Sequence, residues 1–178
     1  MVLRVNDTRL ALGRFAAWYR GTCQALVIAV TGSVGKTSTR EAIYAVLSRR
    51  WPGVRSVKNF NNDIGVPLSL LGLEPEHQFA VIELGASGPG EIARLTEIAG
   101  PRIGVLTAIG SAHLEGFGSI EGVARAKAEL IAGLGRNGIA VLTGDDARVQ
   151  LIGEAARCGV LWYGTRAGTY GLYAQGQN

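Results

Sequence analysis

The stretch VIAVTGSVGKTSTR, residues 27–40, decides the fold of this chain of 178 residues. Its first half is an apolar run of strand length, and its second half is a glycine-rich turn followed by residues that favour a helix. The backbone N–H groups of such a turn and the N-terminus of the next helix form a site for phosphate. Lys36 is the point charge of this site, and Thr37 offers its hydroxyl to a magnesium ion that bridges the phosphates.

The glycines of this turn are more closely spaced than those of the standard phosphate loop. The standard pattern requires a glycine five residues before Gly35, and this sequence has Val30 there. Only the shorter pattern Gly-x-x-Gly-Lys-Thr is present. A glycine turn with a solvated lysine is therefore the alternative, although a strand before the turn and a helix after it favour a phosphate loop.

The rest of the chain repeats the alternation of strand and helix. Strand candidates lie at residues 25–30, 54–57, 79–84, 103–109, 138–143 and 160–164. Amphipathic helical stretches lie at residues 8–20, 36–49, 66–72, 91–99, 120–133 and 146–157. Most strands are apolar on both faces, which predicts an α/β fold with a mainly parallel sheet and helices on both of its faces.

The alternation also predicts how the chain is divided. We expect a linker helix within residues 1–23, a nucleotide-binding domain at residues 24–164 and an irregular tail at residues 165–178. In parallel α/β sheets, ligands bind beyond the carboxyl ends of the strands. The residues that carry the chemistry are therefore expected directly after the strands.

The composition excludes several classes of protein. With 47% hydrophobic and 18% charged residues, the chain is typical of soluble globular proteins. The net charge of +4 is spread along the chain, without the block of like charges typical of a nucleic-acid-binding arm. Asp7 interrupts the apolar core that a signal peptide needs, and no window holds the roughly 20 apolar residues of a membrane span. Cys23 and Cys158 do not form a Cys-x-x-Cys pair, which favours a reducing compartment, so we expect a cytoplasmic protein.

Two residues that follow predicted strands are candidates for metal binding. Glu83 belongs to the apolar run FAVIEL at residues 79–84, so its carboxylate is expected at the same edge as the phosphate loop. The alternative is an ordinary strand-end acid that faces solvent. His113 follows the next strand, and imidazole binds divalent ions, although a lone histidine is more often structural.

Lys127 and Asn62 are weaker candidates for functional residues when the sequence pattern alone is considered. Lys127 borders the apolar stripe of the predicted helix 120–133, where it reads as a surface lysine whose aliphatic stem lies along that stripe. Asn62 lies in NFNNDIGVPLSLL, residues 59–71, and either contacts a phosphate or substrate or only caps the helix that follows.

Taken together, these stretches resemble the Mur ligase family, the ATP-dependent enzymes that add amino acids to the peptidoglycan precursor. The similar stretches follow the family's order over about residues 26–146: VTGSVGKTSTRE, NFNNDIGVPLSLL, AVIELGASGPGEIARL, IGSAHLEGFGSIEGVARAKAEL and GIAVLTGDD. The short glycine spacing is the one found in this family. The asparagine-rich stretch and HLEGFGS are most similar to the branch that adds D-alanyl-D-alanine to the UDP-MurNAc-tripeptide.

The resemblance implies ligands for ATP and for two magnesium ions. It implies that ATP is held by residues in and near the loop: Thr31, Gly32, Ser33, Gly35, Lys36, Thr37, Ser38 and Asn62. Thr37 and Glu83 would hold the first ion. His113 and Lys127 would hold the second, with Lys127 converted by carbon dioxide to a carbamate. Lys36, Glu83, His113 and Lys127 would then carry the catalysis, in which a substrate carboxylate becomes an acyl phosphate that an amine attacks.

The resemblance covers only part of such an enzyme. Family members carry, in the same chain, an N-terminal domain that binds the UDP end, a longer central domain and a C-terminal domain. Ser87 stands where asparagine is frequent in the family. Three hypotheses follow: a D-alanyl-D-alanine-adding ligase, a related ligase such as a folylpolyglutamate or cyanophycin synthetase, or a truncated nucleotide-binding module without turnover. The stretch at residues 59–71 favours the first over the second.

Overall fold

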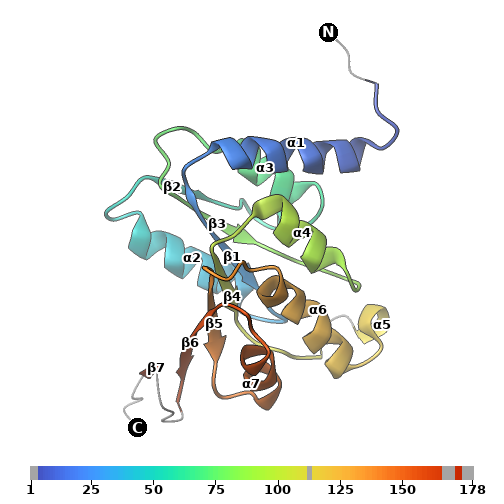
Figure 1. The fold of residues 1–178 in the computed structure, drawn as a ribbon, viewed down its shortest axis with the longest axis vertical. Helices are drawn as coiled ribbons and strands as arrows, with labels where there is room; N and C mark the ends of the chain where they lie inside the picture. The colour runs from blue at the N-terminus through green and yellow to red at the C-terminus, as the bar shows by residue number, and fades with distance from the viewer. Residues whose placement is uncertain (1–3, 112–113, 166–170, 174–178) are drawn as a thin grey trace.

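The computed structural model describes residues 4–111, 114–165 and 171–173. Within them a seven-stranded sheet has the order β2-β3-β1-β4-β5-β6-β7, and every neighbouring pair is parallel (Figure 1). The strands are β1 (Leu26–Thr31), β2 (Gly53–Arg55), β3 (Phe79–Glu83), β4 (Ile103–Leu106), β5 (Ile139–Thr143), β6 (Gly159–Gly164) and β7 (Gly171–Tyr173). The predicted parallel α/β fold is confirmed.

The helices alternate with the strands as the sequence predicts. They are α1 (Thr8–Thr22), α2 (Lys36–Leu47), α3 (Gly65–Leu71), α4 (Glu91–Ala99), α5 (Leu114–Phe117), α6 (Ile120–Ala132) and α7 (Ala147–Glu154). Only the four-residue helix α5 was not expected, because it lies within a glycine-containing segment that reads as a loop. Among the described helices, none has the length and apolar character needed to cross a membrane.

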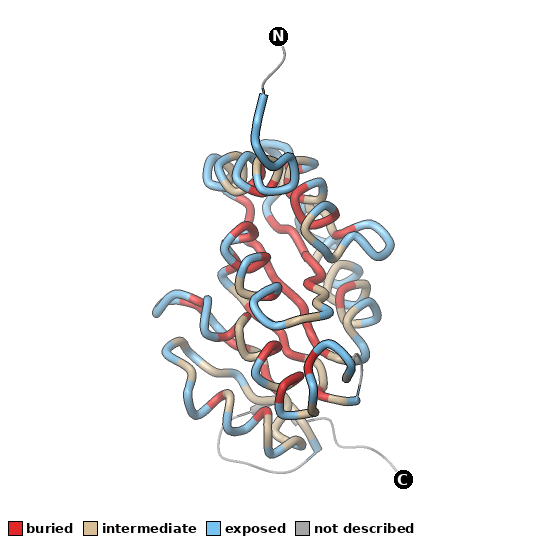
Figure 2. The backbone as a smooth tube through the Cα atoms, turned by 90° about the vertical axis from the view of Figure 1, so that its right-hand side faces the viewer, coloured by how far each residue is buried: buried red, intermediate tan, exposed pale blue. Residues whose placement is uncertain are grey.

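The two faces of the sheet are covered unequally. Helices α1, α3, α4, α6 and α7 pack on the face that carries Val27 and Ile82, where they form the larger core. On the opposite face, Ile28, Val30 and Val81 pack against α2 in a smaller core. Figure 2 shows the buried strands running between the exposed outer surfaces of the helices. Burial on both faces explains why the strands are nearly continuous apolar runs.

Two segments differ from the sequence prediction. Strand β4 ends at Leu106 and not at residue 109, because the next segment bonds the phosphate loop: the Ala108 carbonyl accepts from the N–H of Ser33 over 2.8 Å. The Thr107 hydroxyl also donates to the carbonyl of Val34 over 2.6 Å. The segment at residues 165–178 was expected to be irregular, but it contains β7, which pairs with β6. This pairing satisfies backbone groups that would otherwise form an open edge of the sheet.

The topology determines where a ligand can bind. Strands β3 and β4 lie on opposite sides of β1, so the order of the strands reverses at β1. In open parallel sheets, ligands bind beyond the carboxyl ends of the strands at this reversal. Here those ends carry Thr31 on β1 and Glu83 on β3, and the loop from Gly32 to Gly35 follows directly.

Candidate nucleotide and magnesium site

The loop between β1 and α2 requires its two glycines. Gly32 and Gly35 have φ angles of 149° and 82°, in the region that favours glycine. A Cβ atom on Gly32 would also collide with the hydroxyl of Thr107. Helix α2 begins directly after Gly35, and no described side chain caps its first turn. The N–H groups of that turn are therefore available to a bound anion.

The loop is held in place by the segment that leaves β4. The backbone N–H of Ser33 donates to the carbonyl of Ala108 over 2.8 Å. The Ser33 hydroxyl donates to the carbonyl of Gly110 over 3.1 Å and accepts from the N–H of Gly110 over 2.9 Å. The protein's own contacts therefore set the loop's position, and the sequence alone did not identify Thr107 or Gly110 as its supports.

Lys36 folds back over the loop. Its Nζ donates to the carbonyls of Gly32, over 2.8 Å, and Ser33, over 3.3 Å. It also lines a cavity of about 330 Å³ that Asn62 and Lys127 border from other parts of the chain. These contacts favour the predicted phosphate loop over a simple turn with a solvated lysine.

Glu83 is buried, and both of its carboxylate oxygens accept hydrogen bonds. Only 2% of the residue is exposed, so the alternative of a strand-end acid that faces solvent is wrong. Its Oε2 accepts hydrogen bonds from Thr37 Oγ1 at 2.9 Å and from Arg40 Nη1 at 3.1 Å. Its Oε1 accepts from Asn61 Nδ2 at 3.0 Å. A buried carboxylate needs such partners, because an unpaired buried charge is costly.

The sequence prediction missed both Arg40 and Asn61. One signal was present, because Arg40 follows Thr37 by three residues in a helix, a spacing that places two side chains on the same side. A second was the apolar run around Glu83, since an acid at the end of a buried strand requires a donor from elsewhere.

The residues present fit a magnesium ion. The Thr37 hydroxyl and the Glu83 carboxylate lie within 2.9 Å of each other, and both are the oxygen ligands that magnesium prefers. Among the described residues there is no cluster of three or more His, Cys, Asp or Glu side chains that could hold a metal ion.

Lys127 is buried and only 3% exposed, so the interpretation as a surface lysine is wrong. Its Nζ lies 5.6 Å from the centre of the Phe117 ring. Burial, together with the positive charge of Lys36, lowers the pKa of Lys127 to about 8, against the opposing charges of Glu129 and Glu91. About one Lys127 in ten is then neutral at pH 7, compared with about one in a few thousand for an ordinary lysine.

The remaining candidates have different surroundings. His113 lies outside the described residues. The Asn62 Oδ1 accepts from the N–H groups of Ile64 and Gly65, at 3.2 and 2.9 Å, so this residue caps α3 and also borders the cavity. The fully buried Thr31 hydroxyl donates to the carbonyl of Leu84 over 2.8 Å and so helps to place the loop. Ser38 is exposed in the first turn of α2.

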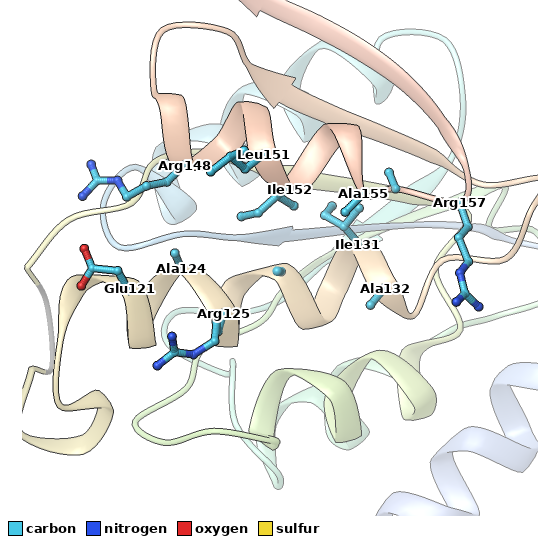
Figure 3. Close-up of a pocket in the computed structure, with 12 residues that line it drawn as sticks. Glu121, Ala124, Arg125, Ile131, Ala132, Arg148, Leu151, Ile152, Ala155 and Arg157 are labelled. Atoms are coloured by element: carbon cyan, nitrogen blue, oxygen red, sulfur yellow. The ribbon is translucent and has the colours of Figure 1, made fainter.

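A second hollow of about 670 Å³ lies between α6 and α7 (Figure 3). Its floor is made of alanine and aliphatic side chains, among them Ala124 and Ile131, and Glu121 and Arg148 lie at one end of it. None of the predicted site residues lines it. The cavity beside the phosphate loop is therefore the candidate functional site.

A parallel sheet, a glycine loop between β1 and α2, a lysine folded over the loop and an acid at the end of β3 together define a P-loop nucleotide-binding domain. Residues 30–177 match the Mur ligase middle domain. The chain therefore belongs to the Mur ligase family, as its sequence motifs suggested.

Curated relatives agree with this assignment. The chain is 50% identical over 144 residues to the UDP-N-acetylmuramoyl-tripeptide--D-alanyl-D-alanine ligase of Escherichia coli, which covers 81% of this chain and 32% of that protein. It is 41% identical over 172 residues to the ligase of the same name from Bacillus subtilis, which covers 97% of this chain and 36% of that protein. The chain thus spans about a third of the length of these relatives.

Solved structures show the same fold. MurF from Acinetobacter baumannii superposes with a TM-score of 0.88 at 43% identity, covering 91% of this chain and 36% of that one. MurF ligase from Thermotoga maritima, in complex with ADP, superposes with a TM-score of 0.86 at 35% identity, covering 93% of this chain and 39% of that one.

Proposed function

We propose that this chain is the nucleotide-binding part of an ATP-dependent ligase that adds D-alanyl-D-alanine to a UDP-MurNAc-tripeptide. The observation that carries the proposal is the arrangement of three features around the carboxyl edge of the sheet: the loop with Lys36, the Thr37–Glu83 pair and the buried Lys127. The names of the similar ligases support the choice of substrates. The domains for the UDP end and the incoming dipeptide would lie elsewhere in the same polypeptide.

The proposed reaction forms an acyl phosphate. A carboxylate oxygen of the peptide attacks the γ-phosphorus of ATP, and ADP leaves with the bridging oxygen. The amine of the dipeptide then attacks the acyl carbon, loses a proton and displaces phosphate, so that an amide bond forms. No protein nucleophile is required, and the chain's contribution is positioning and charge neutralisation.

Each loop residue has a defined part in this proposal. The loop N–H groups from Gly32 to Gly35, the start of α2 and the ammonium group of Lys36 bind the phosphates. Thr37 and Glu83 hold one magnesium ion. When bound, that ion neutralises charge on the transferred phosphoryl group. Ser33 keeps the loop in register with the segment after β4 through its bonds to Gly110.

Lys127 is proposed to become a carbamate that binds a second magnesium ion together with His113. The neutral amine forms a C–N bond with carbon dioxide and loses a proton, which gives an anionic ligand. The lowered pKa of about 8 supports this proposal, because it supplies the neutral amine near pH 7. The bacterial sources of the similar ligases support a bacterial protein, which we propose to be cytoplasmic.

A phosphate-release assay on the whole polypeptide that contains this chain, with ATP, magnesium, UDP-MurNAc-tripeptide and D-alanyl-D-alanine, tests the proposal. We expect phosphate release that requires both peptide substrates. The rate should fall at least about 100-fold in Lys36→Ala, because the variant lacks the positive charge that stabilises the transferred phosphoryl group. Arg136→Ala, on an exposed turn, is the matched control and should not change the rate.

The other outcomes separate the alternatives. Turnover with glutamate in place of the dipeptide would indicate a related ligase. Nucleotide binding without turnover would indicate a binding module. Failure to bind nucleotide at all would contradict each of these functions.

A further inference from the structure

Arg40 is a buried cation in direct contact with the proposed magnesium ligand. Only 3% of the residue is exposed. Its Nη1 donates to Glu83 Oε2 over 3.1 Å and to the carbonyl of Lys58 over 2.7 Å. Its Nε and Nη2 donate to Glu41 Oε1 over 3.2 and 2.7 Å. All three nitrogens are therefore bound, which fixes the guanidinium group beside Glu83.

Arg40 and Thr37 share the same oxygen of Glu83. Oε2 accepts from both, while Oε1 accepts from Asn61. The oxygen next to the Thr37 hydroxyl therefore already interacts with the positive charge of Arg40, which Arg40 shares between Glu83 at 3.1 Å and Glu41 at 2.7 Å.

A positive charge in this position has two opposite effects on a metal ion. It holds the Glu83 carboxylate in place beside Thr37, which favours binding. It also repels a divalent cation that approaches the same oxygen, and this repulsion is strong because the surroundings are buried. A bound polyphosphate makes binding of the metal ion favourable, since its negative charges compensate both Arg40 and the metal ion.

We propose that Arg40 is the counter-ion of Glu83 and a positioning residue that makes magnesium binding depend on the nucleotide. Without nucleotide, Arg40 neutralises Glu83 and keeps the ion out. With nucleotide, the ion binds to Thr37 and Glu83 while Arg40 holds the carboxylate. The proposal rests on the proposed function in one respect, namely that Thr37 and Glu83 hold the nucleotide's magnesium ion.

A purely structural role for Arg40 predicts a different result. If Arg40 only anchors Glu83, its loss should loosen the carboxylate and weaken metal binding both with and without nucleotide. If Arg40 is the counter-ion, its loss should strengthen binding of the metal alone. The sign of the change in metal affinity therefore distinguishes the two roles.

Calorimetric titration of the 178-residue chain with Mn²⁺, with and without saturating ADP, measures this sign. We expect Arg40→Gln to bind Mn²⁺ alone about tenfold or more tightly than the unmodified protein, and to gain less than the unmodified protein does when ADP is added. Arg40→Lys should show a smaller increase, about threefold, because the shorter side chain withdraws its charge from Oε2 without removing it. This milder change decides the sign if Arg40→Gln does not fold.

Two further variants make the result specific. Arg55→Gln removes the same charge from a residue that pairs with Glu41, at 2.7 Å, and should leave Mn²⁺ affinity within about twofold. Adding Thr37→Val to Arg40→Gln should abolish the gain and so locate it at the Thr37–Glu83 pair.

The outcomes separate this inference from the proposed function. Mn²⁺ binding in the presence of ADP together with unchanged or weaker binding of Mn²⁺ alone in both Arg40 variants would overturn the role of Arg40 only. Absence of Mn²⁺ binding even with ADP would overturn the assignment of the metal site, and the role of Arg40 with it.

Discussion

Glu83 and Lys127 are two buried charges near the same loop, and their surroundings differ. Glu83 is 2% exposed and accepts hydrogen bonds from three side chains, one of which is a cation. Lys127 is only 3% exposed, and its Nζ lies 5.6 Å from the centre of the Phe117 ring. Burial and then the like charge of Lys36 lower its pKa, against the opposing charges of Glu129 and Glu91. The charge of Glu83 is therefore compensated by Arg40, whereas burial and the charge of Lys36 disfavour the charged form of Lys127.

This difference indicates different uses. A carboxylate that is held by fixed donors keeps one position, which suits a ligand for a metal ion. An amine whose protonated form is disfavoured changes its charge state easily, which suits a group that reacts or is modified. Three changes to the chain test whether the two residues differ in this way.

The largest effect on stability is expected from Arg40→Met. Removing one partner of a buried ion pair leaves an uncompensated charge, so the free energy of unfolding should fall by about 3–5 kcal/mol. Urea denaturation near neutral pH measures this change. The double variant Arg40→Met/Glu83→Gln should recover most of the loss. A loss below about 1 kcal/mol in the single variant would show that Glu83 does not depend on Arg40.

Lys127→Met should raise the free energy of unfolding, whereas Arg40→Met should lower it. The folded-state pKa of about 8 lies below the ordinary lysine pKa of 10.5, so the unfolded chain binds more protons between these pH values. Stability of the unmodified protein therefore rises with pH across this window. At pH 7 the variant should be more stable by about 3 kcal/mol, because it no longer buries a charge.

The pH dependence is the critical part of this test. The advantage of Lys127→Met should shrink between pH 8 and pH 10.5 when urea midpoints are compared in buffers free of carbon dioxide. An advantage that stays constant across this range would show that the variant acts through packing and not through the charge of Lys127.

The smallest effect is expected from Glu129→Ala. The carboxylate of Glu129, on the same helix as Lys127, accepts from the N–H groups of Gly90 and Ala93 at 2.7 and 2.9 Å and so caps α4. Its loss should cost about 1–2 kcal/mol of unfolding free energy. It should also lower the pKa of Lys127 further, since Glu129 opposes the shift. Arg136→Ala, on an exposed turn, serves as the control. An unchanged pKa of Lys127 in Glu129→Ala would show that the charge of Glu129 does not act on Lys127.

Much of the fold could be predicted because its signals are local. The strand before Gly32 and the helix after Gly35 are adjacent in sequence, and apolar runs of strand length mark every strand except β2 and β7. Tail strand β7 is three residues long and gains its stability from pairing with β6, so no local pattern marks it. The end of β4 was also missed, because the segment after it bonds the phosphate loop, where Thr107 contacts Val34, 73 residues away along the chain.

The candidate site was predicted less completely, for the same reason. Thr37 and Glu83 were expected near each other from topology alone, and the structure brings them together. The partners Arg40 and Asn61 were missed, because their contacts with Glu83 join residues 43 and 22 positions apart. The burial of Lys127 was not predicted either, because the helical pattern places this residue only at the border of the apolar stripe.

By itself, the sequence determined the parallel α/β fold, the phosphate loop and the family, because these depend on periodicity and on the order of short motifs. Only the tertiary structure decided which charges are neutralised and which are not. That outcome depends on burial and on donors brought together from distant segments, and the free energy of a buried charge is set by those neighbours and not by its position in the sequence.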